Sequence, residues 1–246
     1  MSIAAYLAAQ FALPIALIAV IVLIMFLMRP KRFYIVRHGE TLLNLDHIRQ
    51  GEEGLLSEQG RMQAAQVGEY LKQFSIGKII TSTYPRAKET AEILESSLKV
   101  PVVATPLLVE RRNPSEVIGK HTKDPEVERI SDEMDRAYHD DTYRFSDEEN
   151  FVDLKKRAHD CLPFLAWNGV HETVVVTHHV FLKMLIAYML YREHIHAGDF
   201  AKVSFFNWSS NAGITICEFH PWRCLSRTRG WEVVSFNEQV IEGIRE

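Results

Sequence analysis

The residues best suited to chemistry form the segment 37–41, with the sequence RHGET. It follows a short apolar run, residues 33–36, which is typical of a buried strand whose carboxyl end opens into a loop. A histidine there can attack or hold a phosphoryl group, and the preceding arginine can pair with phosphoryl oxygens. The following glycine lets the backbone approach a ligand closely. The segment therefore indicates phosphate chemistry centred on His38.

Two distant segments bring further suitable side chains after predicted strands. Residues 78–81 form a second strand-like run, and Arg86 lies at the start of the helix expected after it. Residues 173–177 form a third such run, and His178 follows it directly. Ligands of parallel sheets bind at the carboxyl ends of the strands. We therefore expect these side chains to gather with His38 at one edge of a sheet.

The elements that must position these residues alternate between strand and helix. Apolar periodicity predicts helices over about 57–74, with Ser57 as N-cap, and over 86–98, 147–167 and 180–190, with an edge strand at 231–236. This alternation predicts the α/β class, in three layers, with a mostly parallel sheet covered by helices on both faces.

Composition limits the classes of protein that this chain can belong to. Its 246 residues are 47% hydrophobic, which is enough for one large catalytic domain, predicted over 33–246. The formal net charge of -4 offers no basic face for nucleic acid. Cys161, Cys217 and Cys224 are widely spaced, so neither a disulfide framework nor a zinc knuckle is expected.

The N-terminal segment 1–28 has the composition of a membrane anchor. It contains no Asp, Glu, Lys, Arg or His, and about 22 helical residues span roughly 33 Å, the thickness of a bilayer's hydrocarbon core. A cleaved signal peptide is the alternative, but a basic n-region and a cleavage site are absent. The basic linker 29–32 follows, and the positive-inside rule then predicts a single-pass membrane protein with its domain on the cytoplasmic side.

One stretch interrupts the alternation of strands and helices. Residues 124–150 hold eleven acidic residues against three arginines. We expect a lid-like insertion over about 112–150, although a solvated helical face explains the charges more simply than a functional patch does.

As a set, these motifs resemble the histidine phosphatase superfamily, which has the phosphoglycerate-mutase-like fold, over roughly residues 33–220. The first motif is 37–41 with Asn44, and residues 49–51 (RQG) and 56–60 (LSEQG) match its continuation. The segment around Arg86 and the one ending in His178 supply the other two parts.

The resemblance implies a role for each candidate site residue. His38 would be the nucleophile, Glu110 the proton donor, and His178 a catalytic group that holds the phosphoryl oxygens. The phosphate-binding residues would be Arg37, Asn44 and Arg86. The sequence departs from the family's pattern at two places. An unusual stretch after Glu110 makes Glu116 a rival acid, and His179 occupies a place usually held by glycine.

The function expected from this resemblance is metal-independent hydrolysis of phosphomonoesters through a phosphohistidine on His38. No cofactor is implied, and the histidine spacing fits no metal-binding helix motif. The alternatives are a phosphoprotein phosphatase and a phosphoglycerate-mutase-type phosphotransferase; a catalytically quiet binding module tethered to the membrane is disfavoured. The expected partners are a phosphorylated small molecule or phosphoprotein as substrate, and the membrane through the N-terminal helix.

Overall fold

The computed structural model describes residues 3–137, 139–206, 209–223, 225–226 and 228–240, without the side chains of 3–11, 13, 26–27 and 205–206. The helices described are α1 (Ile3–Leu27), α2 (Leu42–Leu45), α3 (Glu58–Leu71), α4 (Pro85–Leu98), α5 (Pro125–Arg136), α6 (Phe151–Asn168), α7 (His179–Tyr191) and α8 (Ala197–Phe206). Short 3₁₀ helices are η1 (Pro106–Leu108), η2 (Ser115–Val117), η3 (Arg192–His194) and η4 (Pro221–Arg223).

A six-stranded sheet runs through the domain in the order β3-β2-β4-β1-β5-β6. The first four strands in that order are parallel, whereas β5 and β6 run antiparallel at one edge. The strands are β1 (Lys31–Arg37), β2 (Lys78–Ser82), β3 (Val102–Thr105), β4 (Glu172–Thr177), β5 (Ile214–Phe219) and β6 (Trp231–Glu238). The predicted α/β class is confirmed, and the strand expected at 231–236 is found as β6.

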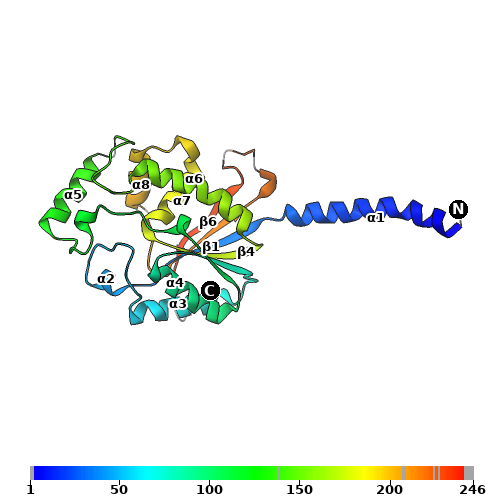
Figure 1. Ribbon diagram of the computed structural model, residues 1–246, viewed down its shortest axis with the longest axis horizontal. Helices are drawn as coiled ribbons and strands as arrows, with labels where there is room; N and C mark the ends of the chain where they lie inside the picture. The colour runs from blue at the N-terminus through cyan, green and yellow to red at the C-terminus, as the bar shows by residue number, and fades with distance from the viewer. Residues whose placement is uncertain (1–2, 138, 207–208, 224, 227, 241–246) are drawn as a thin grey trace.

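Helices cover both faces of this sheet because its central strands are apolar on both sides. Successive side chains of β1 point to opposite faces. Phe33 and Ile35 pack in the cluster formed with α6 and α7, and Tyr34 and Val36 pack in the cluster formed with α3 and α4. Figure 1 shows α6 and α7 above the sheet and α3 and α4 below it. The rigid sheet thus fixes where its loops emerge.

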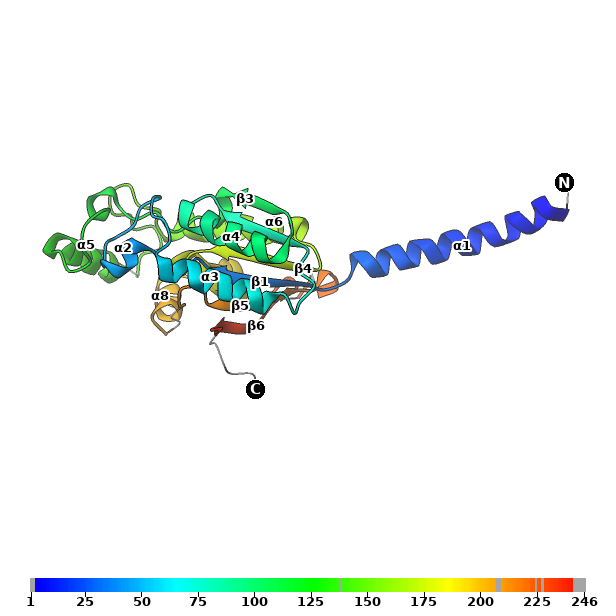
Figure 2. The ribbon, with the colours of Figure 1, turned by 90° about the horizontal axis from the view of Figure 1, so that it is seen from below.

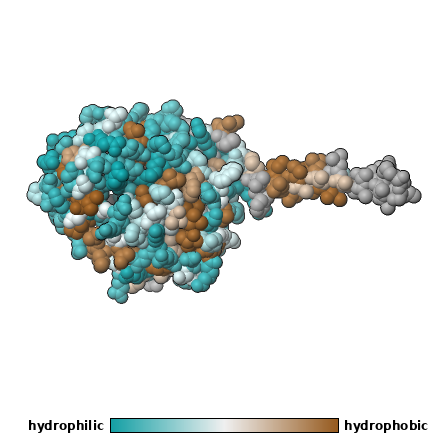
Figure 3. Space-filling view, viewed as in Figure 1, coloured by the Kyte–Doolittle hydropathy of each residue, from teal (hydrophilic) through white to brown (hydrophobic). Residues whose placement is uncertain are grey.

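The predicted membrane anchor, residues 1–28, falls partly outside the described residues. The backbone of α1 forms a helix that extends away from the domain (Figure 2), and its described side chains show as a brown apolar rod beside a largely hydrophilic domain (Figure 3). Within the part of the chain that is described, no helix has the length and apolar character needed to cross a membrane. The linker expected at 29–32 is shorter, because Lys31 and Arg32 already belong to β1.

The acidic insertion is only partly helical. The amphipathic helix α5 packs Val127 and Ile130 against Val117, while its charged residues face solvent. The helix expected to begin at 147 begins instead at Phe151, with Asn150 as its N-cap. Asn150 caps this start by accepting from the Asp153 N–H, while Glu148 before it pairs with Arg111 and Glu149 pairs with Arg157 of α6.

Candidate active site

The candidate site lies where the parallel strands end. His38 follows β1, Arg86 lies in the first turn of α4 after β2, and His178 separates β4 from α7. The rings of His38 and His178 have centroids 5.1 Å apart, and both side chains are buried. The two histidines predicted from distant segments are therefore neighbours.

The His38 ring is fixed in one orientation. Its Nδ1 lies 2.7 Å from the carbonyl oxygen of Gly39, and a carbonyl only accepts, so Nδ1 carries the proton and Nε2 keeps its lone pair. Burial is the main factor that lowers the pKa of His38 well below its usual value, and the charges of Arg86 and Arg37 add to it. His38 is therefore neutral, as a nucleophile must be.

A glycine on each side allows the loop after His38 to approach α3 closely. A Cβ at Gly39 would meet the backbone oxygen of Gly60 at 2.4 Å, and a Cβ at Gly60 would meet that of Glu40 at 2.0 Å. Ser57 caps α3 at this contact by accepting from the Gly60 N–H, and its hydroxyl donates to Glu40. Both glycines are thus required by packing.

His178 is held by a neighbouring strand. Its Nε2 lies 2.8 Å from the hydroxyl of Ser82, the last residue of β2, while its Nδ1 has no hydrogen-bond partner among the described residues. Burial is the main cause that lowers the pKa of His178 well below its usual value, with Arg86 the next. The free Nδ1 of a buried ring is available to a ligand.

Two buried guanidinium groups flank the histidines. Arg37 donates to the carbonyl oxygen of Ser209, and Arg86 donates to the three successive carbonyls of residues 51–53. In both side chains Nε has no partner among the described residues. Burial lowers the pKa of Arg37 to about 10 and also lowers that of Arg86. Each cation therefore keeps donor capacity that an anion would satisfy.

Glu110 interacts electrostatically with both cations, and it also lines an adjoining cleft of about 730 Å³, whose described lining includes neither His38 nor His178. Its carboxylate accepts from the backbone N–H groups of Val180 and Phe181, at the start of α7, at 3.1 and 3.0 Å. The N-terminal end of a helix favours a negative charge. The rival acid Glu116 lies instead in η2, hydrogen-bonded to the Ser115 hydroxyl, and is not among the residues that line this cleft.

Asn44 and His179 are occupied within the protein. The Asn44 side chain accepts from the Thr41 N–H and forms a capping box at the start of α2. His179 points its Nδ1 at the hydroxyl of Ser209, 2.7 Å away, and burial lowers its pKa to about 3. The imidazole that stands where glycine was expected thus faces the loop that also holds Arg37.

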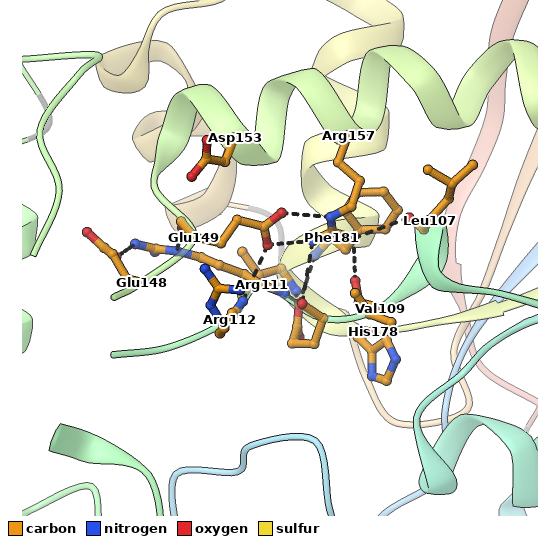
Figure 4. A network of polar contacts seen from close by, with 12 residues as sticks. Leu107, Val109, Arg111, Arg112, Glu148, Glu149, Asp153, Arg157, His178 and Phe181 are labelled. Atoms are coloured by element: carbon orange, nitrogen blue, oxygen red, sulfur yellow. Dashed lines mark hydrogen bonds and ion pairs between the residues drawn. The ribbon is translucent and has the colours of Figure 1, made fainter. Parts of the chain in front are cut away.

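Arg157 of α6 is a site residue that sequence reasoning missed. It donates to the carbonyls of Leu107 and Val109, forms a two-point ion pair with Glu149, and stacks on Phe181 at 4.0 Å (Figure 4). These contacts hold the segment that carries the predicted acid against α6 and α7. The available signal was a single arginine within the apolar stripe of a predicted helix.

Comparison with known proteins decides the family. The sequence model of the histidine phosphatase superfamily (branch 1) matches residues 33–232. The chain belongs to this superfamily. The resemblance drawn from the motifs is thereby confirmed, as is the expectation of an enzyme from a phosphatase family.

Individual relatives match over shorter stretches. The chain is 47% identical over 70 residues to the uncharacterized phosphatase PhoE of Bacillus subtilis, and 41% identical over 78 residues to the probable phosphoglycerate mutase GpmB of Erwinia tasmaniensis. These matches cover 28% and 31% of this chain, and it spans only 36% of the length of either relative.

A solved structure extends the likeness in fold. Mycobacterial glucosyl-3-phosphoglycerate phosphatase superimposes with a TM-score of 0.69 at 23% identity, over 86% of this chain and 100% of that chain. At this level of identity the similarity concerns the fold.

Proposed function

We propose that this protein is a metal-independent phosphomonoesterase that acts through a phosphohistidine on His38. One observation carries the proposal: a neutral His38, with Nε2 free, lies among polar atoms that lack partners in the described part of the chain. These atoms are Nε of Arg37, Nε of Arg86 and Nδ1 of His178. Phosphoryl transfer needs fixed donors around the equatorial oxygens and a nucleophile in line with the leaving group.

The proposed reaction has two steps. His38 Nε2 bonds to phosphorus while the ester P–O bond breaks, and the protonated carboxyl of Glu110 gives its proton to the leaving alkoxide. The Glu110 carboxylate then takes a proton from water as the water oxygen attacks phosphorus. The P–N bond breaks, inorganic phosphate leaves, and His38 is neutral again.

Several contacts support hydrolysis over the mutase alternative. A mutase needs free cations beside the acid to grip the carboxylate of its substrate. Here Arg111 pairs with Glu148, and Arg112 donates to the carbonyl of Asp147. With these guanidinium groups engaged by the acidic insertion, water is the simpler acceptor of the phosphoryl group.

The cleft supports a small monoester as the substrate class. Besides Glu110, four carboxylates line it beside Arg112 and Arg157, so a polyanion would be repelled. The four are Glu52, Glu53, Glu149 and Asp153. A phosphoprotein remains the alternative, and side-by-side turnover of phosphorylated metabolites and phosphopeptides would separate the two.

The experiment that tests the covalent step uses His38→Ala. Hydrolysis of p-nitrophenyl phosphate should fall at least about 10³-fold, because the nucleophile is lost. Brief exposure of the wild type to labelled substrate should yield an acid-labile, alkali-stable phosphoryl adduct that the variant lacks. His159→Ala, on the exposed face of α6, is the control and should keep both. An adduct of equal yield in His38→Ala would refute the assignment.

We further propose that residues 1–28 anchor the chain in a membrane with the domain in the cytoplasm. Support comes from the charge-free sequence of this segment and from the basic residues Arg29, Lys31 and Arg32 after it. The full chain should resist carbonate extraction, whereas a chain beginning at Pro30 should be released. A reporter active only in the cytoplasm, fused after residue 246, should be active. Release of the full chain, or activity only of an external reporter, would contradict the proposal.

A further inference from the structure

A second cleft, of about 670 Å³, opens at the other end of the sheet from His38. Its floor is formed by three strand ends: Lys31 begins β1 and pairs with Phe219 of β5, which pairs with Trp231 of β6. β1 has seven residues, so roughly 20 Å of strand separates this floor from His38. The second cleft is therefore not part of the phosphate site.

The lining combines apolar walls with positive charge. Its cations are Lys31, Arg192 and Arg229, and no acidic residue lines it among those described. The other lining residues are Leu162, Pro163, Ala166, Trp167, Phe219, Pro221 and Trp231. A largely apolar pocket of this size with a few polar groups is typical of a ligand site, and here the charge calls for an anion.

Arg192 is the cation with unsatisfied donors. Its side chain is only 7% exposed, yet Nε and Nη1 have no hydrogen-bond partner among the described residues. The other two cations are engaged, since Lys31 donates to the carbonyls of Ala166 and Gly169, and Arg229 pairs with Glu193 at 3.6 Å. Glu193 acts on Arg192 electrostatically, but two buried N–H donors without hydrogen-bond partners are still unfavourable, and an acceptor bound in this cleft would satisfy them.

The backbone at Arg192 supports the same conclusion. Its φ of 55° and ψ of -137° lie in a region that residues other than glycine rarely adopt. The strained residue caps α7 and begins η3, and its side chain lines the cleft with the Tyr188 ring 4.8 Å from the guanidinium. Strain of this kind recurs at ligand sites, where the side chain must reach a set position.

We propose that this cleft binds an anionic phospholipid of a membrane surface, with the phosphate on Arg192 and an acyl chain along Trp167 and Trp231. Arginine matches the geometry of phosphate oxygens, and the apolar walls match the chain. Trp167 is 88% exposed at the rim, where a tryptophan suits the interface between water and lipid. This end of the domain is also the one from which α1 leaves (Figure 2).

The test uses the full chain in a nonionic detergent and dihexanoyl phosphatidylglycerol below its micelle concentration. The probe should raise the unfolding temperature by roughly 5–10 °C at a hundredfold excess over Kd. Dihexanoyl phosphatidylcholine, which has the same chains but no net charge, should give a far smaller shift. Arg192→Gln should abolish the response, whereas Arg223→Gln, a matched loss of an arginine outside the cleft, should keep it.

Two further variants keep the test decisive if Arg192→Gln fails to fold. Trp167→Ala removes an exposed side chain from the rim of the cleft, so it should weaken the apparent affinity for the anionic lipid about tenfold without disturbing the fold. Arg192→Gly relieves the backbone strain and should fold while losing the response. Equal shifts from both lipids, an unchanged response in Arg192→Gly, no shift in the wild type, or stabilisation by octanoate alone would each overturn the assignment.

Discussion

At the scale of single residues, buried arginines without anions mark both ends of the domain. Arg37 and Arg86 near His38, and Arg192 in the second cleft, form no ion pair with any carboxylate in the described part of the chain. Backbone carbonyls satisfy part of the donor capacity of the first two. Glu110 acts electrostatically on the first two and Glu193 on the third, but the Nε of each guanidinium is buried without a hydrogen-bond partner, and an anion that binds from outside would satisfy it.

The two candidate acids can be separated by leaving-group dependence. Glu110→Gln should slow hydrolysis of an alkyl phosphate by about 10²–10⁴-fold, because a leaving alkoxide needs a proton. Hydrolysis of p-nitrophenyl phosphate should fall much less, because its phenolate leaves without one. Glu116→Gln is the matched control and should behave as the wild type with both substrates. If Glu116→Gln showed the selective loss, the acid would have to be reassigned.

The role of a residue could be predicted where a motif specifies it, but not where the role depends on contacts with residues far away in the sequence. The spacing of strand and loop was enough to bring His38, Arg86 and His178 together. The part played by Arg157 could not be found, because it acts on carbonyls about 50 positions earlier in the chain. Nothing in the sequence showed that Asn44 would use its oxygen to cap α2.

At the scale of elements, the acidic insertion shows why composition is a weak guide to role. Seven of its eleven carboxylates are exposed, five of them on α5, as the simpler interpretation held. Glu148 and Glu149 differ, because they pair with Arg111 and Arg157 and so brace the segment around Glu110. Both residues lie before α6, which begins only at Phe151. Helical periodicity gives no information on which carboxylates pair across the fold, so the predicted boundary was wrong.

At the scale of the whole molecule, the sheet separates two sites. The alternating pattern was sufficient to predict β1, β2 and β4 in a mostly parallel sheet with helices on both faces, whereas β3 was not predicted. It could not show that β5 and β6 would join antiparallel, since their order depends on pairing with β1 rather than on local pattern. That addition creates the second cleft, because the paired ends Phe219 and Trp231 form its floor. The candidate active site and an apolar, cationic cleft thus occupy opposite ends of one rigid layer.

The buried histidines should also make the stability of the whole domain depend on pH. The pKa values of His38, His178 and His179 are all lowered by burial, so the folded state stays neutral where the unfolded chain, with pKa near 6.5, takes up protons. The free energy of unfolding should therefore be highest above pH 6.5 and fall as the pH drops toward 5, by up to about 1.4 kcal/mol per pH unit for each histidine.

Urea unfolding of the wild type and of His178→Asn between pH 7 and pH 5 measures this dependence. The variant should lose stability less steeply, by about 1.4 kcal/mol per pH unit below pH 6, because one proton-binding difference between the two states is gone. Ser82→Ala is the control: it removes the hydrogen bond to His178 but keeps the ring, so stability should fall by about 1 kcal/mol at every pH with the slope unchanged. Equal slopes for the wild type and His178→Asn would mean that His178 takes up protons in the folded domain over this pH range as it does in the unfolded chain, and it would then not have the lowered pKa that its burial and the charges of Arg86 and His38 imply.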